Sequence, residues 1–408
     1  MLKIKTLIEL FDTCQIENVI AGLSFLPEKI VFIGFKEAMT EKRRNDLATF
    51  FKMSGIDVKL EFEIVGRYDY SAIYEKLNAI IDQNEDCCLD LTGGKELVLT
   101  AMGAVSAVRN LPMLQFDIRM GKLLRVNGCD DIPEPDKKSM TIAENVALNG
   151  GAIVADEKDD FEWDMNNDFK KDIEKIWGIC KRNCGLWNRL STVFESMERY
   201  GRIDGSLRVS VNLTHMRNCH QDTFQDMRII DMLKDDGLIF DYEADGDMLS
   251  FRYKNAQVHR CLTKAGNILE LYTYKTALEI AANDPDYYDD IGIGVFVDWD
   301  GIIHNEEENA KDTRNEIDII LMRGLIPVFI SCKNGEVRKE ALYEINTVAE
   351  KFGGEYAKKI LLTTYISHDK ESRDFIIQRA KDMKVEIIEG VDKMTRNEFA
   401  TVLKRTAK

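Results

Sequence analysis

The chain has 408 residues, which is more than one ordinary hydrophobic core needs and indicates two or three domains. Hydrophobic residues make up 45% of the composition and charged residues 31%, as in a globular protein with a packed interior. The formal net charge of -16 argues against a compact DNA-binding protein that relies on neutralising phosphates. It argues less against an enzyme whose acidic residues hold a divalent cation, because the cation reverses the local charge.

The sequence contains no apolar run of the length that a membrane span needs. Residues 2–10 are apolar but short and include Glu9, so they are predicted to form a first strand and not a signal peptide. Without an export signal we expect a cytoplasmic protein. We expect its nine cysteines to be thiols there.

Residues 1–128 alternate between strand and helix patterns. Strands are predicted at 4–10, 30–34, 57–64, 87–91 and 113–119, with helices at 16–25, 38–54, 70–83 and 95–109. This alternation is typical of an α/β fold with a mostly parallel sheet and helices on both faces. Ligands of such sheets bind at the carboxyl ends of the strands. The helix at 95–109 is apolar nearly all round, so we expect it to be buried.

The stretch Thr92-Gly93-Gly94-Lys95 joins one of these strands to the apolar helix. Two glycines allow a ligand to approach the backbone closely, and a helix N-terminus offers free N–H groups to a phosphate. Lys95 adds a cation to that surface. The alternative is a tight turn between a strand and a helix with no ligand. The loop lacks the G-x4-G-K-[ST] pattern of a nucleotide-binding P-loop.

Residues 129–262 differ from the preceding segment in composition and in the pattern of predicted elements. An acidic, turn-rich stretch at 130–136 is followed by helical patterns from 169 onward, which end in two short strands at 238–242 and 248–253. A helix, a turn and a two-stranded ribbon form the winged-helix pattern. Its function is either contact with DNA or a spacer or dimerisation role, and the acidity of the segment favours the spacer.

Residues 263–408 are predicted to form a second α/β module. We expect a helix at 264–280, strands at 292–299, 315–322 and 326–332, a helix at 336–352 and a strand at 359–364. A helix at 371–383 and a strand at 384–388 are expected to close the chain.

Two neighbouring strands of this module carry acids and a lysine near their ends. Side chains alternate along a strand, so Glu316 and Asp318 share one face, as do Ser331 and Lys333. Adjacent strands would bring Asp318 and Lys333 together. Asp318 could anchor a divalent cation, with the backbone carbonyl of Cys332 as a further oxygen ligand. Such a cation polarises a phosphate and activates water, while Lys333 orients that water or neutralises developing charge.

The order of these features resembles the PD-(D/E)XK restriction-endonuclease-like superfamily over roughly 263–365. The resemblance is carried by a helix, an acidic strand and a strand ending in lysine: Gly266-x3-Glu270, Asn315-Glu316-x-Asp318 and Ser331-x-Lys333. It implies that Glu270, Asp318, position 331 and Lys333 form a metal site.

Position 331 departs from the superfamily pattern, because Ser331 stands where an acid is usual. Glu316, Glu270 or Asp300 could supply the missing carboxylate. Either residue pair alone would be ordinary for a solvated strand end, so the prediction depends on the order of all the elements.

The N-terminal segment resembles the CARF domain, a Rossmann-like sensor of cyclic oligoadenylates, over about 1–128. The likeness lies in four stretches: 9–15, 18–21, 27–34 and 91–95. A CARF domain followed by a restriction-endonuclease-like domain is similar to the ancillary effector nucleases of type III CRISPR systems.

This second resemblance implies a homodimer that binds cyclic tetra-adenylate between subunits and then cuts single-stranded DNA or RNA with manganese or magnesium. It implies that phosphates and nucleosides of the effector contact two loops: Thr92, Gly93, Gly94 and Lys95 on one, Asp12, Thr13 and Gln15 on the other. The segment 129–262 would transmit the signal. Two alternatives remain, a CARF-type regulator with a winged helix and a degenerate nuclease fold, and an enzyme that uses a nucleotide cofactor.

Overall fold

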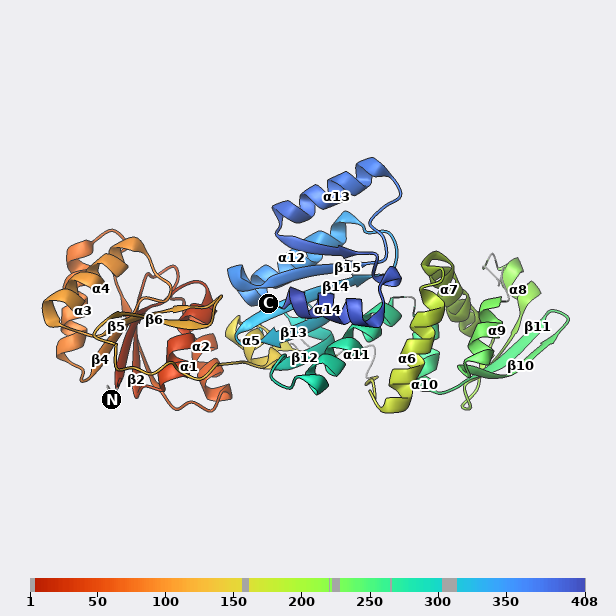
Figure 1. Cartoon of the computed structure of the whole chain (residues 1–408), viewed down its shortest axis with the longest axis horizontal. Coiled ribbons are helices and arrows are strands. Elements are labelled where there is room, and N and C mark those ends of the chain that lie inside the picture. The colour runs from red at the N-terminus through yellow and green to blue at the C-terminus, as the bar shows by residue number, and fades with distance from the viewer. Residues whose placement is uncertain are drawn as a thin grey trace.

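The computed structural model describes residues 4–155, 161–219, 221, 228–264, 266–302 and 314–407. These residues form three β-sheets with helices packed against them, which confirms the predicted α/β fold. The three blocks lie in a row (Figure 1), with the C-terminal sheet between the N-terminal sheet and the middle segment. The order of the blocks in space therefore differs from their order along the chain.

The N-terminal sheet has the strand order β3-β2-β1-β4-β5-β6. Its strands are β1 (Thr6–Leu10), β2 (Lys29–Gly34), β3 (Lys59–Ile64), β4 (Cys87–Asp90), β5 (Met113–Asp117) and β6 (Lys122–Asn127). The first five are parallel, and β6, which was not predicted, pairs antiparallel with β5. The parallel arrangement places the β1 and β4 loops at the same edge of the sheet.

Helices cover both faces of this sheet. They are α1 (Ile20–Phe25), α2 (Glu41–Met53), α3 (Tyr70–Asp82) and α4 (Glu96–Arg109). Leu7 belongs to the same apolar cluster as α1 and α2, whereas its neighbour Ile8 belongs to that of α3 and α4, as strand alternation requires. The expectation that α4 would be buried all round was wrong, because Leu97 and Val108 are 36% and 75% exposed.

The middle segment combines helices with a small antiparallel sheet of order β10-β11-β9-β8. Its elements are α6 (Asn167–Cys180), α7 (Cys184–Tyr200), β8 (Arg202–Ile203), β9 (Arg208–Asn212), α8 (Leu213–Asn218), α9 (Arg228–Asp235), β10 (Ile239–Asp245), β11 (Met248–Tyr253) and α10 (Ala256–Thr263). The predicted two-stranded ribbon is present as β10 and β11. Two further strands, β9 and β8, extend it.

The C-terminal sheet has the order β16-β15-β14-β13-β12-β7. Its strands are β7 (Ala152–Ile153), β12 (Asp290–Asp298), β13 (Arg314–Arg323), β14 (Ile326–Lys333), β15 (Lys358–Thr363) and β16 (Val385–Glu389). The strands from β7 to β14 are antiparallel, and β15 and β16 run parallel to β14. The short β7 comes from the stretch predicted as a linker.

The helices of this block are α5 (Ile142–Leu148), α11 (Asn267–Asn283), α12 (Lys339–Gly353), α13 (Lys370–Asp382) and α14 (Arg396–Thr406). α11 and α14 belong to one apolar cluster with β13 and β14, and α5, α12 and α13 belong to the cluster on the other face. The final helix α14 was not predicted, because the closing pattern was expected to end in a strand.

The middle segment and the C-terminal block share one continuous apolar core. Trp177 of α6 stacks on Tyr272 of α11, with ring centroids 5.1 Å apart. Beside them, the buried Lys275 ammonium is bound by Glu174 at 2.5 Å and Glu279 at 2.8 Å. These contacts hold α11 in one orientation, which matters because α11 carries Glu270.

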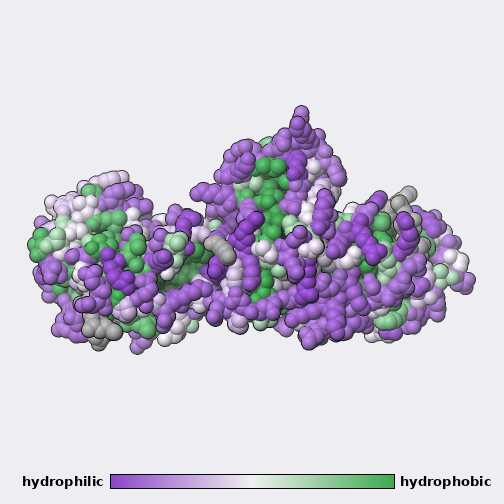
Figure 2. All heavy atoms as spheres, viewed as in Figure 1, coloured by the Kyte–Doolittle hydropathy of each residue, from purple (hydrophilic) through white to green (hydrophobic). Residues whose placement is uncertain are grey.

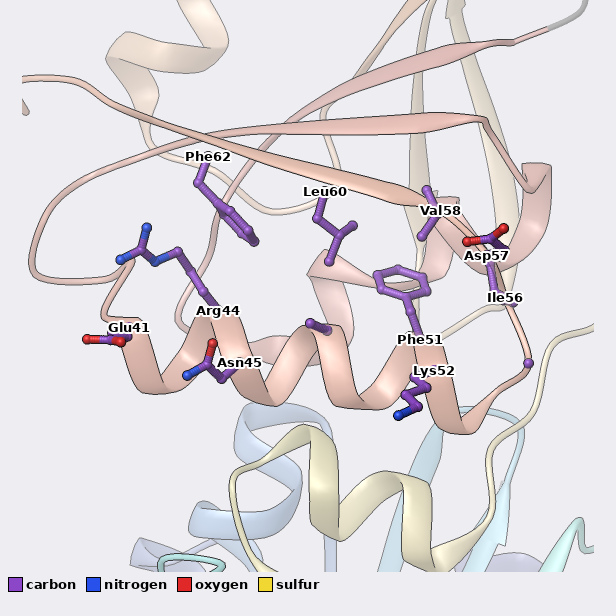
Figure 3. A pocket seen from close by; sticks show the side chains of 12 residues that line it. Glu41, Arg44, Asn45, Phe51, Lys52, Ile56, Asp57, Val58, Leu60 and Phe62 are labelled. Atoms are coloured by element: carbon purple, nitrogen blue, oxygen red, sulfur yellow. The ribbon is translucent and has the colours of Figure 1, made fainter.

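Hydrophilic residues cover most of the face drawn in Figure 2. Among the described residues, no helix is both long enough and apolar enough to span a bilayer. All nine cysteines are free thiols. A cavity of about 760 Å³ lies between α2 and β3 (Figure 3), with Arg44 above the ring of Phe62. None of the predicted site residues lines this cavity.

Candidate functional site

The centre of the C-terminal sheet brings together Asp318 and the end of β14. Ile319 of β13 pairs with Ile330 of β14, so Asp318 lies beside Ser331. One carboxylate oxygen of Asp318 accepts hydrogen bonds from the Cys332 amide at 2.7 Å, the Ser331 hydroxyl at 3.2 Å and the Lys333 ammonium at 3.4 Å. Three donors on one oxygen fix the carboxylate in place.

Glu270 approaches this group from the first turn of α11. Burial, followed by the negative charges of Asp318 and Glu316, raises the pKa of Glu270 to about 8, while Lys333 and Lys264 act in the opposite direction. At neutral pH Glu270 is therefore mostly protonated. A cation placed among these carboxylates would remove the cause of that shift.

Glu316 lies on the same face as Asp318 and lines the cavity that Glu270 also lines. The register of β12 against β13 passes from Ile293–Ile319 to Val295–Ile317, which places Gly294 across from Asp318. Gly294 has a φ of +56°, a left-handed conformation that glycine adopts without strain.

Asp300 does not join these acids. Asp298 pairs with Arg314, four residues along β13 from Asp318, so it lies about 14 Å away at 3.4 Å per residue. Asp300 follows beyond that strand end and acts on the pKa of Lys351, on the far side of the sheet. Of the three residues considered for the missing carboxylate, only Glu270 and Glu316 lie near Asp318.

Lys333 is half-buried next to this acidic group. Burial alone would lower the pKa of Lys333, but the Asp318 carboxylate outweighs it and the net pKa is raised. The neighbouring Cys332 thiol is buried, lies 3.8 Å from the Thr273 hydroxyl and has a strongly raised pKa. Lys333 thus carries a permanent positive charge toward the site, and Cys332 stays a neutral thiol.

The residues fit a hard divalent cation in donor chemistry and in electrostatics. Glu270 and Asp318 supply carboxylate oxygens, and the Cys332 carbonyl lies at the same strand end. Within the described parts of the chain, no group of three or more acidic, histidine or cysteine side chains is arranged to hold a metal. Two carboxylates suit Mg²⁺ or Mn²⁺, since Mg²⁺ usually retains water or phosphate ligands.

The middle segment forms hydrogen bonds with the turn that follows Lys333. The Asn188 side chain of α7 donates a hydrogen bond to the Asn334 backbone carbonyl at 2.5 Å, and the Asn334 side-chain amide donates to the Asn188 side-chain oxygen at 3.1 Å. The Asn334 side-chain nitrogen also lies 3.3 Å from the Cys180 sulfur. These bonds fix the position of the lysine-bearing strand end relative to α7.

In the N-terminal block, Thr92 is buried and its hydroxyl is fully used. It donates to Asp90 at 2.6 Å and accepts from the Phe116 amide at 2.7 Å. The next two residues, Gly93 and Gly94, have φ of +72° and +137° and are half-buried. Lys95 is exposed at the start of α4. The structure therefore presents Gly93, Gly94 and Lys95 to solvent and uses Thr92 to shape the loop.

In the loop after β1, too, some side chains shape the loop and another is exposed. The Asp12 carboxylate accepts from the Cys14 amide at 3.0 Å and the Thr13 hydroxyl at 3.3 Å. Gln15 is buried and accepts from Asn18 at 3.1 Å. Asp12 and Gln15 thus hold the loop together, and Thr13 is exposed.

Glu17 links both loops to the C-terminal sheet. A Cβ atom on Gly93 would lie 2.5 Å from a Glu17 carboxylate oxygen, so only glycine fits there. The other oxygen accepts a hydrogen bond from the Tyr356 hydroxyl at 2.7 Å, just before β15. Burial raises the pKa of Glu17 to about 7, and the Tyr356 bond opposes that rise. The Arg119 guanidinium lies 5.4 Å from the Tyr356 ring.

The sequence analysis missed Glu17, Tyr356, Asn188 and the role of Asn334. Each acts through a partner more than a hundred residues away, and only the fold reveals such pairs. The glycines at 93 and 94 offered one signal, because two adjacent glycines indicate that another side chain approaches closely.

Comparison with known proteins agrees with this fold. Residues 256–401 match the family model of the Card1-like endonuclease domain, which confirms the predicted endonuclease-like character of this segment. No curated protein matches the chain.

Solved structures extend the likeness over the whole chain. Can2 from Sulfobacillus thermosulfidooxidans, in complex with cyclic tetra-adenylate, is 14% identical, with a TM-score of 0.69 over 98% of both chains. Protein VC1899 from Vibrio cholerae is 16% identical, with a TM-score of 0.72 over 98% of both chains. A type III CRISPR defence DNA nuclease activated by cyclic oligoadenylate is more distant, at 14% identity and a TM-score of 0.45 over 89% of this chain and 45% of that one. The whole chain shares the fold of Can2 and VC1899, and its C-terminal part matches the model of the Card1-like endonuclease domain.

Proposed function

We propose that this protein is a metal-dependent endonuclease that a cyclic oligoadenylate activates. The observation that carries the proposal is the Asp318 carboxylate in the middle of β13, held by the Cys332 amide and the Lys333 ammonium at the end of β14. Glu270, with its raised pKa, faces it from α11. The group lies inside the segment that matches an endonuclease domain.

The chain's own residues divide the chemistry among them. Asp318, Glu270 and the Cys332 carbonyl would hold Mg²⁺ or Mn²⁺, which when bound polarises the scissile phosphate and lowers the pKa of a water. Glu316 lines the same cavity as Glu270 and would add a carboxylate only if it moves toward the cation. Lys333 holds its positive charge beside the phosphate and offsets the negative charge that develops there. Ser331 binds Asp318 and keeps its carboxylate oriented.

The proposed effector is cyclic tetra-adenylate, which the fold neighbour Can2 binds. Gly93, Gly94 and Lys95 would hold its phosphates and Thr13 would contact a nucleoside, while Thr92, Asp12 and Gln15 shape those loops. A four-fold ring contains two-fold symmetry, so a homodimer can contribute one such patch from each subunit. Leu97 in the first turn of α4 and Val108 in its last turn are exposed and would supply apolar surface for that dimer.

Activation requires the effector to bind one arrangement of the protein better than another. Glu17 lies against Gly93 and binds Tyr356, so a movement of the effector loops reaches the C-terminal sheet directly. The proposed role is antiviral defence in a type III CRISPR system. The proposed substrate is single-stranded DNA or RNA.

A cleavage assay with Mn²⁺ on single-stranded DNA, single-stranded RNA and plasmid, with and without cyclic tetra-adenylate, tests the proposal. We expect effector-dependent cleavage of single strands, and its loss in Lys333→Ala with unchanged effector binding. The matched control is Lys370→Ala on the outer helix α13. Wild-type cleavage by Lys333→Ala would refute the assigned site.

One observation favours a second function. Ser331 replaces an acid, and no group of three metal-ligating side chains forms within the described residues. A ligand-sensing regulator with the winged-helix-like β10–β11 ribbon would need no intact metal site. It would bind the effector and duplex DNA but release no cleaved product under any of the assay conditions above.

A further inference from the structure

A cavity of about 610 Å³ opens beside Glu270 and Glu316. This volume lies within the range of about 300–1,000 Å³ that is typical of pockets for small molecules and nucleotides. Its walls come from α10 and the start of α11, from β12 and β13, and from residues 161–166, a strap that leads into α6. Two further acids, Glu162 and Asp290, line it as well, and the Asp290 carboxylate is occupied by the Ile142 and Ile291 amides. The lining also contains aromatic and basic side chains that have no part in the proposed metal site.

The wall formed by the strap is aromatic. Phe161 and Trp163 lie edge to face, with ring centroids 5.1 Å apart and planes at 76°. Trp163 is stacked in turn on the buried Phe169, with centroids 5.5 Å apart and planes at 4°. The strap is tied to α10, because Gln257 accepts from the Asp164 amide at 2.7 Å and donates to its carbonyl at 3.2 Å. The two rings thus form a supported surface.

The adjoining wall is basic. The Arg260 guanidinium lies 4.6 Å from the Phe161 ring centroid and 6.0 Å from that of Trp163. Lys264 follows one turn later at the mouth of the same cavity, where it is exposed. Two cations therefore lie beside an aromatic pair in this cavity. Aromatic rings with interleaved cations are typical of sites that bind single-stranded nucleic acid.

We propose that this cavity is a nucleobase subsite, in which Phe161 and Trp163 contact a base of a single strand and Arg260 and Lys264 contact its phosphates. The inference rests on the proposed nuclease function, since it places the adjoining phosphate at Glu270 and Glu316. A base inside a duplex is stacked on both sides and enters such a cavity only after extrusion. The subsite therefore accounts for a preference for single strands.

Equilibrium binding tests the subsite without requiring cleavage. The full chain carrying Lys333→Ala is titrated, in Mn²⁺ and cyclic tetra-adenylate, with a fluorescent single-stranded DNA and with the same backbone lacking bases. Trp163→Ala should weaken binding of the normal strand about tenfold, as the loss of one stacked base does. Its affinity for the abasic strand should not change.

Two variants guard against a general structural defect. Trp163→Phe keeps an aromatic face and should restore most of the affinity for the normal strand. Phe375→Ala removes a comparable exposed ring on α13, which Arg379 covers at 5.5 Å, and should have no effect. Equal losses for the normal and abasic strands, or no loss for either, would overturn the subsite.

A small phosphodiester separates failure of the subsite from failure of the proposed function. Hydrolysis of bis(p-nitrophenyl) phosphate by the unaltered chain needs the metal site but no nucleobase, so it tests the nuclease chemistry apart from the subsite. If the unaltered chain hydrolyses no phosphodiester, the nuclease proposal fails. The difference between normal and abasic strands in the binding assay then still decides whether the cavity accepts a base.

Discussion

The two α/β blocks use the ends of their strands in different ways. In the C-terminal block, the motif residues Asp318 and Lys333 contact each other and face one site. In the N-terminal block, Asp12, Gln15 and Thr92 turn inward and fix the loops, while Gly93, Gly94 and Lys95 reach the surface. Buried charged groups need partners of opposite charge, so the residues of a catalytic motif stay in contact with one another. A binding loop can instead contact its ligand through backbone groups, and its side chains then serve to fix the shape of the loop.

This contrast predicts that substitutions in the C-terminal group affect chemistry and leave effector binding intact. Asp318→Asn removes the charge that anchors Lys333 and the proposed cation. We expect the activated cleavage rate to fall at least about 100-fold, since electrostatic groups of this kind contribute on that scale. Rates measured beside Asp374→Asn, an exposed control on α13, would test it. Cleavage within a few-fold of the unaltered chain would place the site elsewhere.

The raised pKa of Glu270 predicts a pH dependence of metal binding. Its pKa is about 8 in the fold, so a cation that needs the carboxylate must displace a proton at lower pH. The Mn²⁺ affinity should increase about tenfold per pH unit up to pH 8, and calorimetry in two buffers should detect one released proton. Glu270→Gln should abolish that proton release. An Mn²⁺ affinity that does not depend on pH would show that Glu270 does not bind the metal.

The same shift has a consequence for stability without metal. Between the ordinary value of 4.5 and about 8, the folded chain holds a proton on Glu270 that the unfolded chain has lost. The free energy of unfolding should therefore decrease as the pH rises through that window. Glu270→Gln should flatten this decrease, whereas Glu371→Gln on α13 should leave it unchanged. Urea melts at several pH values would measure both.

Lys95→Glu is the corresponding change in the N-terminal block. Reversing one exposed charge in the effector loop should weaken cyclic tetra-adenylate binding by about tenfold or more, because it replaces attraction to a phosphate with repulsion. The activation curve should shift to higher effector concentration, while hydrolysis at saturating effector and the Mn²⁺ affinity stay unchanged. An unshifted curve would place the effector pocket away from this loop.

Tyr356→Phe tests the connection between the two blocks and should have the smallest effect. It removes the hydroxyl that donates a hydrogen bond to Glu17 and leaves the ring in contact with Arg119. Coupling contributions of single contacts lie at about 0.5–2 kcal/mol, so maximal activation should fall about three- to tenfold with effector affinity nearly unchanged. Tyr343→Phe, on the exposed side of α12, is the matched control. Full activation of Tyr356→Phe would show that the signal travels by another route.

The sequence predicted the elements of both α/β blocks and the residues of the acidic group, because these depend on local periodicity and on motif order. It did not predict β6 or α14, whose patterns are short or weakly periodic. It also assigned Thr92 to a ligand, because a hydroxyl beside two glycines gives no indication that Asp90 and Phe116 already satisfy it. The contact of Glu17 with Tyr356 joins residues 339 positions apart, and no local pattern contains it.

The chain order also concealed the direct contact between the blocks. Residues 129–262 separate the N-terminal and C-terminal blocks in sequence, which made that segment the expected transmitter. In space the C-terminal sheet lies between the other two blocks (Figure 1) and touches each of them. Asn188 and Asn334 give the middle segment a separate contact with the lysine-bearing turn.

The most direct test of the account is the initial rate at which the full chain cleaves an end-labelled single-stranded DNA in Mn²⁺ as cyclic tetra-adenylate is titrated. We predict almost no cleavage without the effector, a saturable rise as it is added, and complete loss of activity when the metal is chelated. A rate that does not depend on the effector, or that persists after chelation, would contradict the account.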